Sequence, residues 1–454
     1  MTTSLTSDQK AGADEFFLFL HNEKRDFVLS GGAGVGKTFL MGHIANDVMQ
    51  KYHDSCKIMG TTPAYDTVSF TATTNKAAEV LELSLGKPVQ TVHSFLGLKV
   101  KDNYKTGKSD IEKVKNWQPK RPQIVFIDES SMIDSKLYDL IWETLPGSKV
   151  VFVGDHAQMS PVSEALSPIY ANIDPQNFVF LNQPIRNADS PDLMNLCTQL
   201  RQTVETGEFF RIQEAPGSVE YLNKEEMPLA LDRYFAKDLN PSARILCYTN
   251  ERVGDYNEYI RQIRGLPEQI TAGDILVVAQ TYQNGKDMLS VEREVEILTV
   301  SSIAESCGYG SLFTDGIPIG YYEATLIVAG SQVPMEINLP ENQERWKMGL
   351  KILAKQKRWQ EFFELKNQCV DLRDKAACTA YKAQGSTYET VFIDLGNIGT
   401  SFDANQVARM LFVAASRPTS RIFLFGRLPN RYSGGDFSWS TVQTNPSVQT
   451  ASVA

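Results

Sequence analysis

Several features that define particular classes of protein are missing from this 454-residue sequence. No stretch approaches about eighteen consecutive apolar residues, the length that a membrane-spanning helix requires. The first residues, MTTSLTSDQK, lack the apolar core of a signal peptide. We therefore expect a protein that stays in the cytoplasm and has no membrane partner.

Cysteine, histidine and net positive charge are also in short supply. The six cysteines include no C-x-x-C pair, and the five histidines are not grouped at metal-ligand spacing, which indicates reduced thiols and no metal cluster. A net charge of −9 argues against a protein coated in positive charge. Any contact with nucleic acid must then come from a local track of residues, because the global field would repel phosphate.

One stretch, LSGGAGVGKTFL (29–40), carries the most specific pattern in the chain. It fits the phosphate-binding loop G-x-x-x-x-G-K-[ST] in full, after an apolar run typical of a buried strand. Loop N–H groups and the following helix N-terminus would face a polyphosphate, while Lys37 would reach the β- and γ-phosphates and Thr38 a Mg²⁺ ion. A chance glycine-rich turn is the weaker interpretation. We predict an ATP and Mg²⁺ site at Gly31, Gly32, Ala33, Gly34, Val35, Gly36, Lys37 and Thr38.

The chain is longer than a single core supports, so two or more domains are expected. From residue 1 to about 190, and again at 243–249 and 376–426, apolar strands alternate with helical patterns, which predicts parallel sheets covered by helices. Residues 270–335 change to short strands with glycine turns, which suggests a small β barrel. The fold class is therefore α/β with an inserted barrel, and the Ser/Thr-rich tail from 429 is expected to be disordered.

Polar residues follow two further apolar strands. Asp128 and Glu129 end the strand at 124–128, where one carboxylate can hold Mg²⁺ and the other can deprotonate an attacking water. Gln158 follows the next strand, and its amide can sense a γ-phosphate. Arg186 and Arg417 lie near element ends, from which a guanidinium could reach the γ-phosphate across a cleft. Each pair or residue alone could equally be a surface feature, and the prediction depends on their combination.

Taken in order, these segments resemble the motif series of superfamily-one DNA helicases. The likeness is strongest to the RecD/Pif1-like branch and, within it, to phage Dda-type helicases, and it covers roughly residues 4–426. The segments that carry it include LTSDQK, GGAGVGKT, TATTNKAAEVL, QTVHSFLGL, VFIDESSM, VGDHAQMSPV, LNQPIRN, CTAYKAQGST and LFVAASRP.

The resemblance implies a division of the chain. Two RecA-like parallel-sheet domains would clamp ATP between them, with a small hairpin insertion in the first and an SH3-like β-barrel insertion in the second. The implied boundaries are 1–96 and 121–182 for the first domain, 97–120 for its insertion, 183–268 and 370–428 for the second domain, 269–369 for its insertion, and 429–454 for the tail.

The resemblance also implies roles for residues. Lys37, Glu129, Gln158, Arg186 and Arg417 would act in hydrolysis, Thr38 and Asp128 would hold the metal, and Gln9 would read adenine. Single-stranded DNA would cross both domains through phosphate contacts that tolerate any sequence. The matching positions are Thr74, Asn75, Lys76, Thr91, His93, Ser94, Thr379, Lys382, Gln384 and Gly385.

Some local alternatives stay open. His93 alone would be a packed histidine, and residues 97–120 could be a solvated loop instead of a strand-separating hairpin. If the hairpin forms, Tyr104 or Trp117 could supply an apolar wedge. The aromatic residues at 346–363 could brace the barrel against that hairpin, although packing within a helix is the expectation we favour.

The predicted function is an ATP-dependent DNA helicase that acts at single-strand/duplex junctions. The resemblance favours a monomer that travels 5′ to 3′, in replication, recombination or repair, in the host cytoplasm if phage-encoded, with single-strand-binding or replisome proteins as candidate partners. One alternative is a translocase that displaces proteins or remodels forks. Another, of a different class, is a nucleotide-switched interaction protein, against which Glu129, Arg186 and Arg417 argue.

Overall fold

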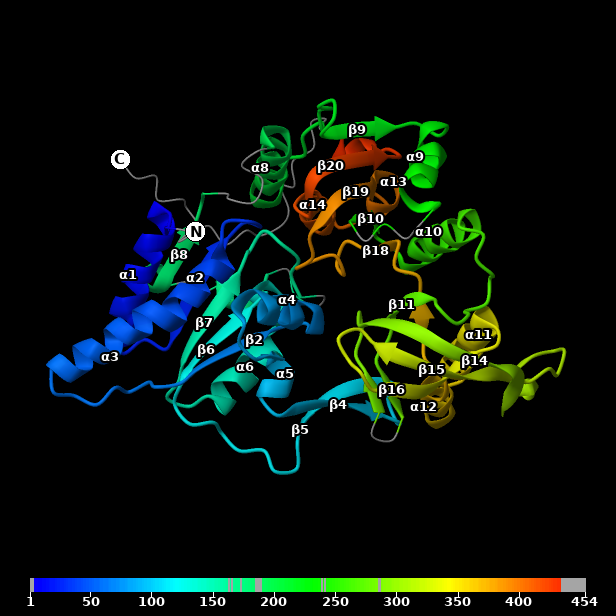
Figure 1. Cartoon of the computed structure of the whole chain (residues 1–454), viewed down its shortest axis with the longest axis horizontal. Helices are drawn as coiled ribbons and strands as arrows, with labels where there is room; N and C mark the ends of the chain where they lie inside the picture. The colour runs from blue at the N-terminus through cyan, green and yellow to red at the C-terminus, as the bar shows by residue number, and fades with distance from the viewer. Residues whose placement is uncertain are drawn as a thin grey trace.

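Two parallel sheets of six and five strands, a five-stranded antiparallel sheet and two hairpins organise the protein (Figure 1). The computed structural model describes residues 4–433, except 162, 163, 165, 172–173, 184–189, 238–239, 241 and 285–286. In Figure 1 the first parallel sheet lies on the left, the second at the upper right and the antiparallel sheet at the lower right. None of the helices in the described part combines the length and the apolar character that a membrane crossing requires.

The first parallel sheet has the strand order β3-β2-β6-β7-β1-β8. Its side chains alternate between two cores, so that Val151 packs with Phe16 on one face and Val150 packs with Leu137 on the other. Because helices cover both faces, a central strand is buried at every position, which explains its continuous apolar sequence.

The elements of this domain follow the predicted alternation. The strands are β1 (Asp26–Gly31), β2 (Val68–Ala72), β3 (Val89–Thr91), β6 (Ile124–Asp128), β7 (Lys149–Gly154) and β8 (Phe178–Leu181). The helices are α1 (Ser7–His21), α2 (Lys37–His43), which continues through a π-helical turn (Ile44–Val48) into α3 (Met49–Ile58), α4 (Asn75–Leu85), α5 (Val92–Phe95), α6 (Ser135–Thr144) and α7 (Pro168–Ala171).

The second parallel sheet has the order β18-β10-β19-β20-β9. Its strands are β9 (Val219–Leu222), β10 (Ala243–Cys247), β18 (Ala377–Thr379), β19 (Tyr388–Asp394) and β20 (Pro418–Phe425). Its helices are α8 (Pro191–Thr206), α9 (Glu226–Phe235), α10 (Asn250–Ile263), α13 (Leu395–Ile398) and α14 (Ala404–Ala415). Cores again lie on both faces. The prediction of two RecA-like parallel-sheet domains is confirmed.

An antiparallel sheet of order β16-β15-β14-β11-β17 is inserted in the second domain. Its edge strands approach each other, because Val370 N–H donates to the Asn338 carbonyl at 2.9 Å, but the SH3-like barrel stays a prediction. The strands are β11 (Ile275–Val278), β14 (Glu294–Gly308), β15 (Ile319–Val328), β16 (Pro334–Pro340) and β17 (Leu372–Arg373), beside the hairpin β12 (Tyr282–Asn284) and β13 (Asp287–Leu289). Helices α11 (Gln343–Lys355) and α12 (Trp359–Gln368) complete the insertion.

A second hairpin, β4 (Leu98–Asn103) and β5 (Lys108–Lys113), leaves the first domain and reaches α12 (Figure 1). At its tip the ring of Tyr104 meets Phe363 edge-on, with centroids 5.3 Å apart. A Cβ on Gly107 would lie 2.4 Å from the ring of Trp359, so the turn and the indole are in close contact. Trp117 instead anchors the base, where its indole N–H donates to the Leu96 carbonyl at 3.0 Å.

The aromatic residues at 346–363 therefore pack within a helical core and also contact the hairpin, the two alternatives that the sequence left open. Trp346 is 1% exposed within a core between α11 and α12, whereas Trp359 and Phe363 contact the hairpin tip. Packing within a helix, the alternative favoured from sequence, accounts only for the first of these residues.

The predicted disordered tail begins too early. Tyr432 is 1% exposed in the core beneath α14, and its hydroxyl donates to the Ser401 carbonyl at 3.0 Å. No apolar run marks this segment in the sequence, and one buried aromatic ring is enough to anchor it. The rest of the predicted tail, 434–454, lies outside the described residues.

Candidate nucleotide cleft and nucleic-acid interface

The glycine-rich loop joins β1 to α2 at the carboxyl edge of the first sheet. Gly34 and Gly36 have φ values of 80° and 81°, in the left-handed region that glycine adopts without strain. A Cβ on Gly31 would lie 2.7 Å from the Leu181 carbonyl oxygen, so this glycine is required by the approach of β8. The loop thus has the backbone geometry that the sequence pattern predicts.

Lys37 is the cation at the centre of the cleft. Its Nζ donates to the carbonyl oxygens of Gly31 and Gly32 at 2.7 and 2.9 Å. Burial lowers the pKa of Lys37, although the charge of Asp155, foremost among the nearby carboxylates, acts to raise it. Arg417 of the second domain adds to the lowering, which places a second positive charge within electrostatic range of the lysine.

Asp128 and Glu129 stand at the end of β6, beside the loop. Burial, followed by the charge of Glu129, raises the pKa of Asp128 to about 7. Glu129 has a φ of 54°, which is uncommon for a residue other than glycine. The Glu129 backbone N–H donates to Asp128 Oδ1 at 2.9 Å. The two adjacent carboxylates therefore occupy different environments, as the strand end predicts.

The second domain contributes Arg417, which is 2% exposed. Its guanidinium donates to the carbonyls of Val413 and Ser386 at 3.0 and 3.3 Å, and to the Ser416 hydroxyl at 2.8 Å. These contacts within the second domain hold the Arg417 guanidinium on the side of that domain that faces Lys37. The other predicted arginine, Arg186, lies outside the described residues.

Two arginines that the sequence analysis missed cross from the second domain to the first. Arg201 of α8 pairs with Asp155 at 2.9 Å, and Arg409 of α14 donates to the carbonyls of His156 and Gln158. Burial alone would raise the pKa of Asp155, but the charges of Arg201 and Lys37 outweigh it and lower that pKa. Both arginines look like ordinary helix-surface residues in the sequence, and the signal that could have indicated a cation is Asp155, three positions before Gln158.

The side chain of Gln9 in α1 contacts the backbone of the glycine-rich loop. Its amide nitrogen donates to the carbonyls of Val35 and Gly36 at 3.2 and 3.4 Å, and its oxygen accepts from the Thr6 N–H at 3.0 Å. The predicted adenine-reading residue thus lies against the glycine loop, where it also fixes the loop's backbone.

The cleft residues fit a nucleoside triphosphate with its metal. Within the described part of the chain, Gln158 Oε1, Gln384 Oε1 and Arg201 Nη2 are buried without hydrogen-bond partners. Buried polar atoms of this kind are costly unless a ligand or water completes them. No group of three or more His, Cys, Asp or Glu that could hold a metal occurs among the described residues.

The predicted DNA-contact residues come from three neighbouring segments at the carboxyl edges of β2, β3 and β18. Thr74 and Thr91 cap helices, accepting from Ala77 N–H at 3.1 Å and Ser94 N–H at 3.3 Å. The segments from the two domains meet, since a Cβ on Gly385 would lie 3.9 Å from Ala77 Cβ. The remaining predicted DNA-contact residues are Asn75, Lys76, His93, Ser94, Lys382 and Gln384, together with Thr379, which is buried.

Two lysines on this surface are paired with glutamates. Lys76 lies 3.3 Å from Glu79, and Lys382 lies 2.9 Å from Glu292, in the turn before β14. His93 is partly buried, and burial lowers its pKa while Asp134 acts to raise it. A bound phosphate would therefore compete with these carboxylates for the lysines.

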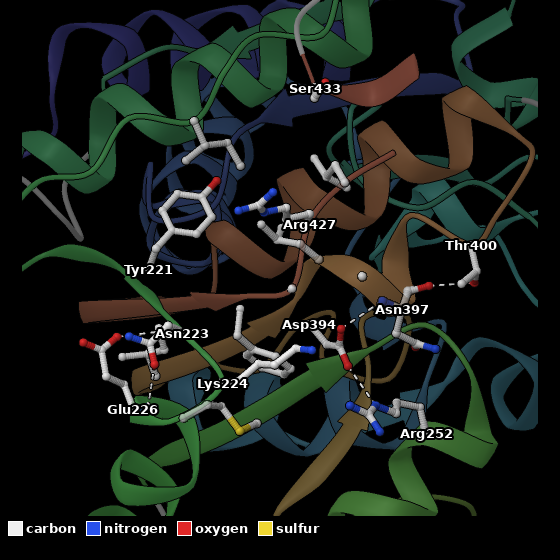
Figure 2. A pocket seen from close by; sticks show the side chains of 18 of the residues that line it. Tyr221, Asn223, Lys224, Glu226, Arg252, Asp394, Asn397, Thr400, Arg427 and Ser433 are labelled. Atoms are coloured by element: carbon white, nitrogen blue, oxygen red, sulfur yellow. Dashed lines mark hydrogen bonds and ion pairs between the residues drawn. The ribbon is translucent and has the colours of Figure 1, made fainter. Parts of the chain in front are cut away.

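A cavity of about 1900 Å³ lies elsewhere, at the carboxyl edge of the second sheet (Figure 2). None of the predicted site residues lines it. In its lining, Asp394 accepts from Arg252 Nε at 2.9 Å, and Asn397 accepts from the Tyr248 N–H at 2.7 Å. The chemistry indicated by the sequence belongs to the cleft and not to this cavity.

Comparisons with known proteins agree with the motif series. The family described as AAA domain matches residues 4–223. The chain is 22% identical over 459 residues to the ATP-dependent DNA helicase dda of Enterobacteria phage T4, covering 92% of this chain and 98% of that protein. It is 20% identical over 503 residues to the uncharacterized protein R530 of Acanthamoeba polyphaga mimivirus, covering 91% and 98%.

Solved structures align over nearly the whole chain. The Pif1 helicase from Candida albicans is 16% identical with a TM-score of 0.49, covering 96% of this chain and 97% of that one. The Pif1 helicase from Bacteroides in complex with ADP-AlF3 and ssDNA is 12% identical with a TM-score of 0.49, covering 95% and 94%.

Proposed function

We propose that this chain, which belongs to the superfamily-one helicases of the Pif1 and Dda type, is an ATP-dependent DNA helicase that moves along single-stranded DNA and opens duplex ahead of it. One observation carries the proposal. Arg201, Arg409 and Gln384 of the second domain contact Asp155, the carbonyls of His156 and Gln158, and Glu129 of the first. A nucleotide bound between the two domains would favour one relative position of the domains over others.

In the proposed site each residue has one task. Lys37 would bind the β- and γ-phosphates, and Glu129 would orient and deprotonate the attacking water. Gln158 would sense the γ-phosphate through its buried amide, while Arg186 and Arg417 would stabilise charge in the transition state. Mg²⁺, held by Thr38 and Asp128, would neutralise phosphate charge when bound. Because burial raises the pKa of Asp128 to about 7, a cation bound beside it would favour its ionised form.

The proposed motion follows from the same contacts. ATP would draw the domains together, and hydrolysis would release them, while the DNA-contact residues of each domain alternate in holding the strand. Opening one base pair costs about 1.4 kcal/mol of stacking, so a modest bias per turnover is sufficient. The direction, 5′ to 3′, is proposed from family resemblance.

The β4–β5 hairpin is proposed to part the strands, since it projects from the first domain beside the DNA-contact residues of α5. The protein would act as a monomer at single-strand/duplex junctions in the cytoplasm during replication, recombination or repair. Single-strand-binding or replisome proteins are its proposed partners.

Strand displacement tests the proposal. Duplexes with a 5′ or a 3′ single-stranded overhang are mixed with protein, with and without ATP, and separated strands are measured by fluorescence. We expect ATP-dependent displacement from the 5′ overhang only. Displacement from the 3′ overhang would reverse the proposed direction, and stripping of a bound protein without displacement would indicate a translocase.

Lys37→Ala and Glu129→Gln should each abolish DNA-stimulated phosphate release, by at least about a hundredfold, because each removes a group that acts in the chemical step. Lys24→Ala is the matched control, since Lys24 pairs with Asp174 at 2.6 Å on the surface before β1. Circular dichroism should show all three variants folded. Undiminished hydrolysis in Lys37→Ala or Glu129→Gln would contradict the assigned roles.

A further inference from the structure

A hydrogen bond joins a residue of the predicted DNA surface to the proposed catalytic carboxylate. The side-chain amide of Gln384 donates to Glu129 Oε2 at 2.8 Å, across the domain boundary and 255 positions along the chain. The same amide nitrogen lies 3.3 Å from the Ser131 hydroxyl. Sequence reasoning placed Gln384 with DNA and Glu129 with ATP, and the structure puts them in direct contact.

The turn that carries Gln384 is well ordered by its own backbone. The N–H groups of Lys382 and Ala383 donate to the Thr379 carbonyl at 3.0 and 3.1 Å. Gly385 follows with a φ of 79°, and a Cβ there would lie 3.5 Å from Glu129 Oε1. Both carboxylate oxygens of Glu129 therefore lie against this turn, and a movement of the turn must change the surroundings of the carboxylate.

Contacts within the first domain also restrain the backbone of Glu129. Its left-handed φ of 54° stores strain that the surrounding contacts must offset. Its carbonyl accepts from the Thr73 hydroxyl and the Met132 N–H, each at 3.2 Å. With the backbone fixed, the orientation of the carboxylate depends on its side-chain partner, which is Gln384.

Glu129 and a DNA phosphate are alternative hydrogen-bond partners for the side-chain amide of Gln384. Gln384 Nε2 has two N–H donors, and both already have acceptors in Glu129 Oε2 and the Ser131 hydroxyl, so donation to a DNA phosphate would displace one of these two. Within the described residues its Oε1 is buried and has no hydrogen-bond partner, so the amide is not satisfied in its present arrangement. A small energetic difference can therefore move it between partners.

We infer that Gln384 is a positioning residue that restrains Glu129 and releases it when DNA binds the Thr379–Gly385 turn. The inference rests on the proposed function and adds how DNA would stimulate hydrolysis. While the amide holds Oε2, the carboxylate is turned toward the second domain and the attacking water competes for it. DNA that takes the amide frees the carboxylate, and by linkage a free carboxylate strengthens DNA binding to the same degree.

Gln384→Met tests the inference, because methionine keeps the length of the side chain and removes the donor. We expect hydrolysis without DNA to rise on the order of tenfold, the size of one charge-assisted hydrogen bond, while the DNA-saturated rate changes little. The ratio of the DNA-saturated rate to the DNA-free rate should therefore fall. Thr387→Ala, an exposed change three positions on in the same segment, should leave both rates as in the wild type.

A fall in the DNA-free rate would overturn the inference in favour of an orienting role, and an unchanged ratio would overturn it outright. If Gln384→Met does not fold, Glu129→Ala provides the reciprocal readout. Its affinity for a fluorescent single-stranded oligonucleotide should exceed that of the wild type several-fold, and an equal or weaker affinity contradicts the inference. Absence of DNA-stimulated hydrolysis in the wild type would instead refute the proposed function.

Discussion

At the scale of single residues, buried arginine and lysine side chains make contacts that join parts of this protein distant in sequence. Arg201 and Arg409 cross between the domains, and Lys149 is enclosed within the first domain with only 2% of its surface exposed. Lys149 Nζ donates to the carbonyls of Asn22 and Lys24 at 3.0 and 2.6 Å. It also lies 4.1 Å from the ring centroid of Phe19. Such a lysine is held by neutral acceptors, so its charge is expensive to keep.

Stability should depend on pH through Lys149. Burial lowers its pKa from the ordinary 10.5 to about 8, against the charge of Asp26, which acts to raise it. Between these values the unfolded chain binds a proton that the folded chain has released. The free energy of unfolding should therefore rise as pH increases from 8 to 10.5, by at most about 1.4 kcal/mol per pH unit from this group, and fall as pH decreases through the same window.

Lys149→Met removes this contribution, and urea unfolding of the wild type and the variant at pH 8 and pH 10 measures it. The wild type should gain more stability over that interval than the variant does. Equal gains would mean that Lys149 keeps its proton throughout.

Individual site residues could be predicted from sequence where the chemistry is local. The glycine loop with Lys37, and the Asp128–Glu129 pair, are each recognisable within a few positions of a strand end. Arg201 and Arg409 could not be found in this way, because a helix-borne arginine acquires a role only when a distant carboxylate or carbonyl packs against it. The partner of Gln384 was missed for the same reason.

At the scale of elements, the helices and strands that carry the cleft could be predicted closely, since buried strands such as β7 have continuous apolar sequences. The π-helical turn at Ile44–Val48 could not, because one extra residue in a helix leaves the apolar pattern almost unchanged. The 97–120 stretch forms a hairpin although it is too polar for a core, and its tip is stabilised by aromatic residues 250 positions away in α12.

The contact between the hairpin tip and α12 should matter for unwinding more than for hydrolysis. Trp359→Ala removes the ring that covers Gly107 and leaves Tyr104 in place. We expect strand displacement to slow by about fivefold, as for loss of a contact worth about 1 kcal/mol, because a loose tip no longer opposes the duplex. Hydrolysis stimulated by single-stranded DNA should persist, since the cleft is untouched.

Phe402→Ala is the matched control for that measurement, because Phe402 is 88% exposed and lies in the second domain after α13. Equal displacement by Trp359→Ala and the wild type would show that the tip needs no support from α12. Parallel loss of hydrolysis would show that the contact acts on the cleft instead.

At the scale of the whole molecule, the end of the described chain closes the second domain. The ring of Tyr432 lies 5.0 Å from Phe209, between centroids, and its hydroxyl is bonded to Ser401. Truncation after Ser433 should leave stability and unwinding nearly unchanged. Truncation after Pro429 should cost about 3–5 kcal/mol, the usual loss for a large aromatic side chain from a core.

Urea unfolding of the two truncated proteins beside the full chain separates these expectations. Similar stability for both would mean that the ring contributes little to the core. A large loss of unwinding on truncation after Ser433 would instead assign a function to residues 434–454.

The mutual placement of the domains was the least predictable feature. The sequence indicated two parallel sheets and their insertions, but the pairs that join them, Glu129 with Gln384 and Tyr104 with Phe363, are each separated by more than two hundred positions. No periodicity reports such a pair, because each member is compatible with a solvent-exposed place in its own element.

The hairpin has its two ends in different parts of the molecule. Its strands are rooted in the first domain, and its turn rests on α12, which belongs to the other half of the chain. A rotation of one half against the other cannot leave both attachments undisturbed, so either the turn slides over the helix or the two strands bend. Each movement of one domain against the other would in this way reach the hairpin that is proposed to part the strands.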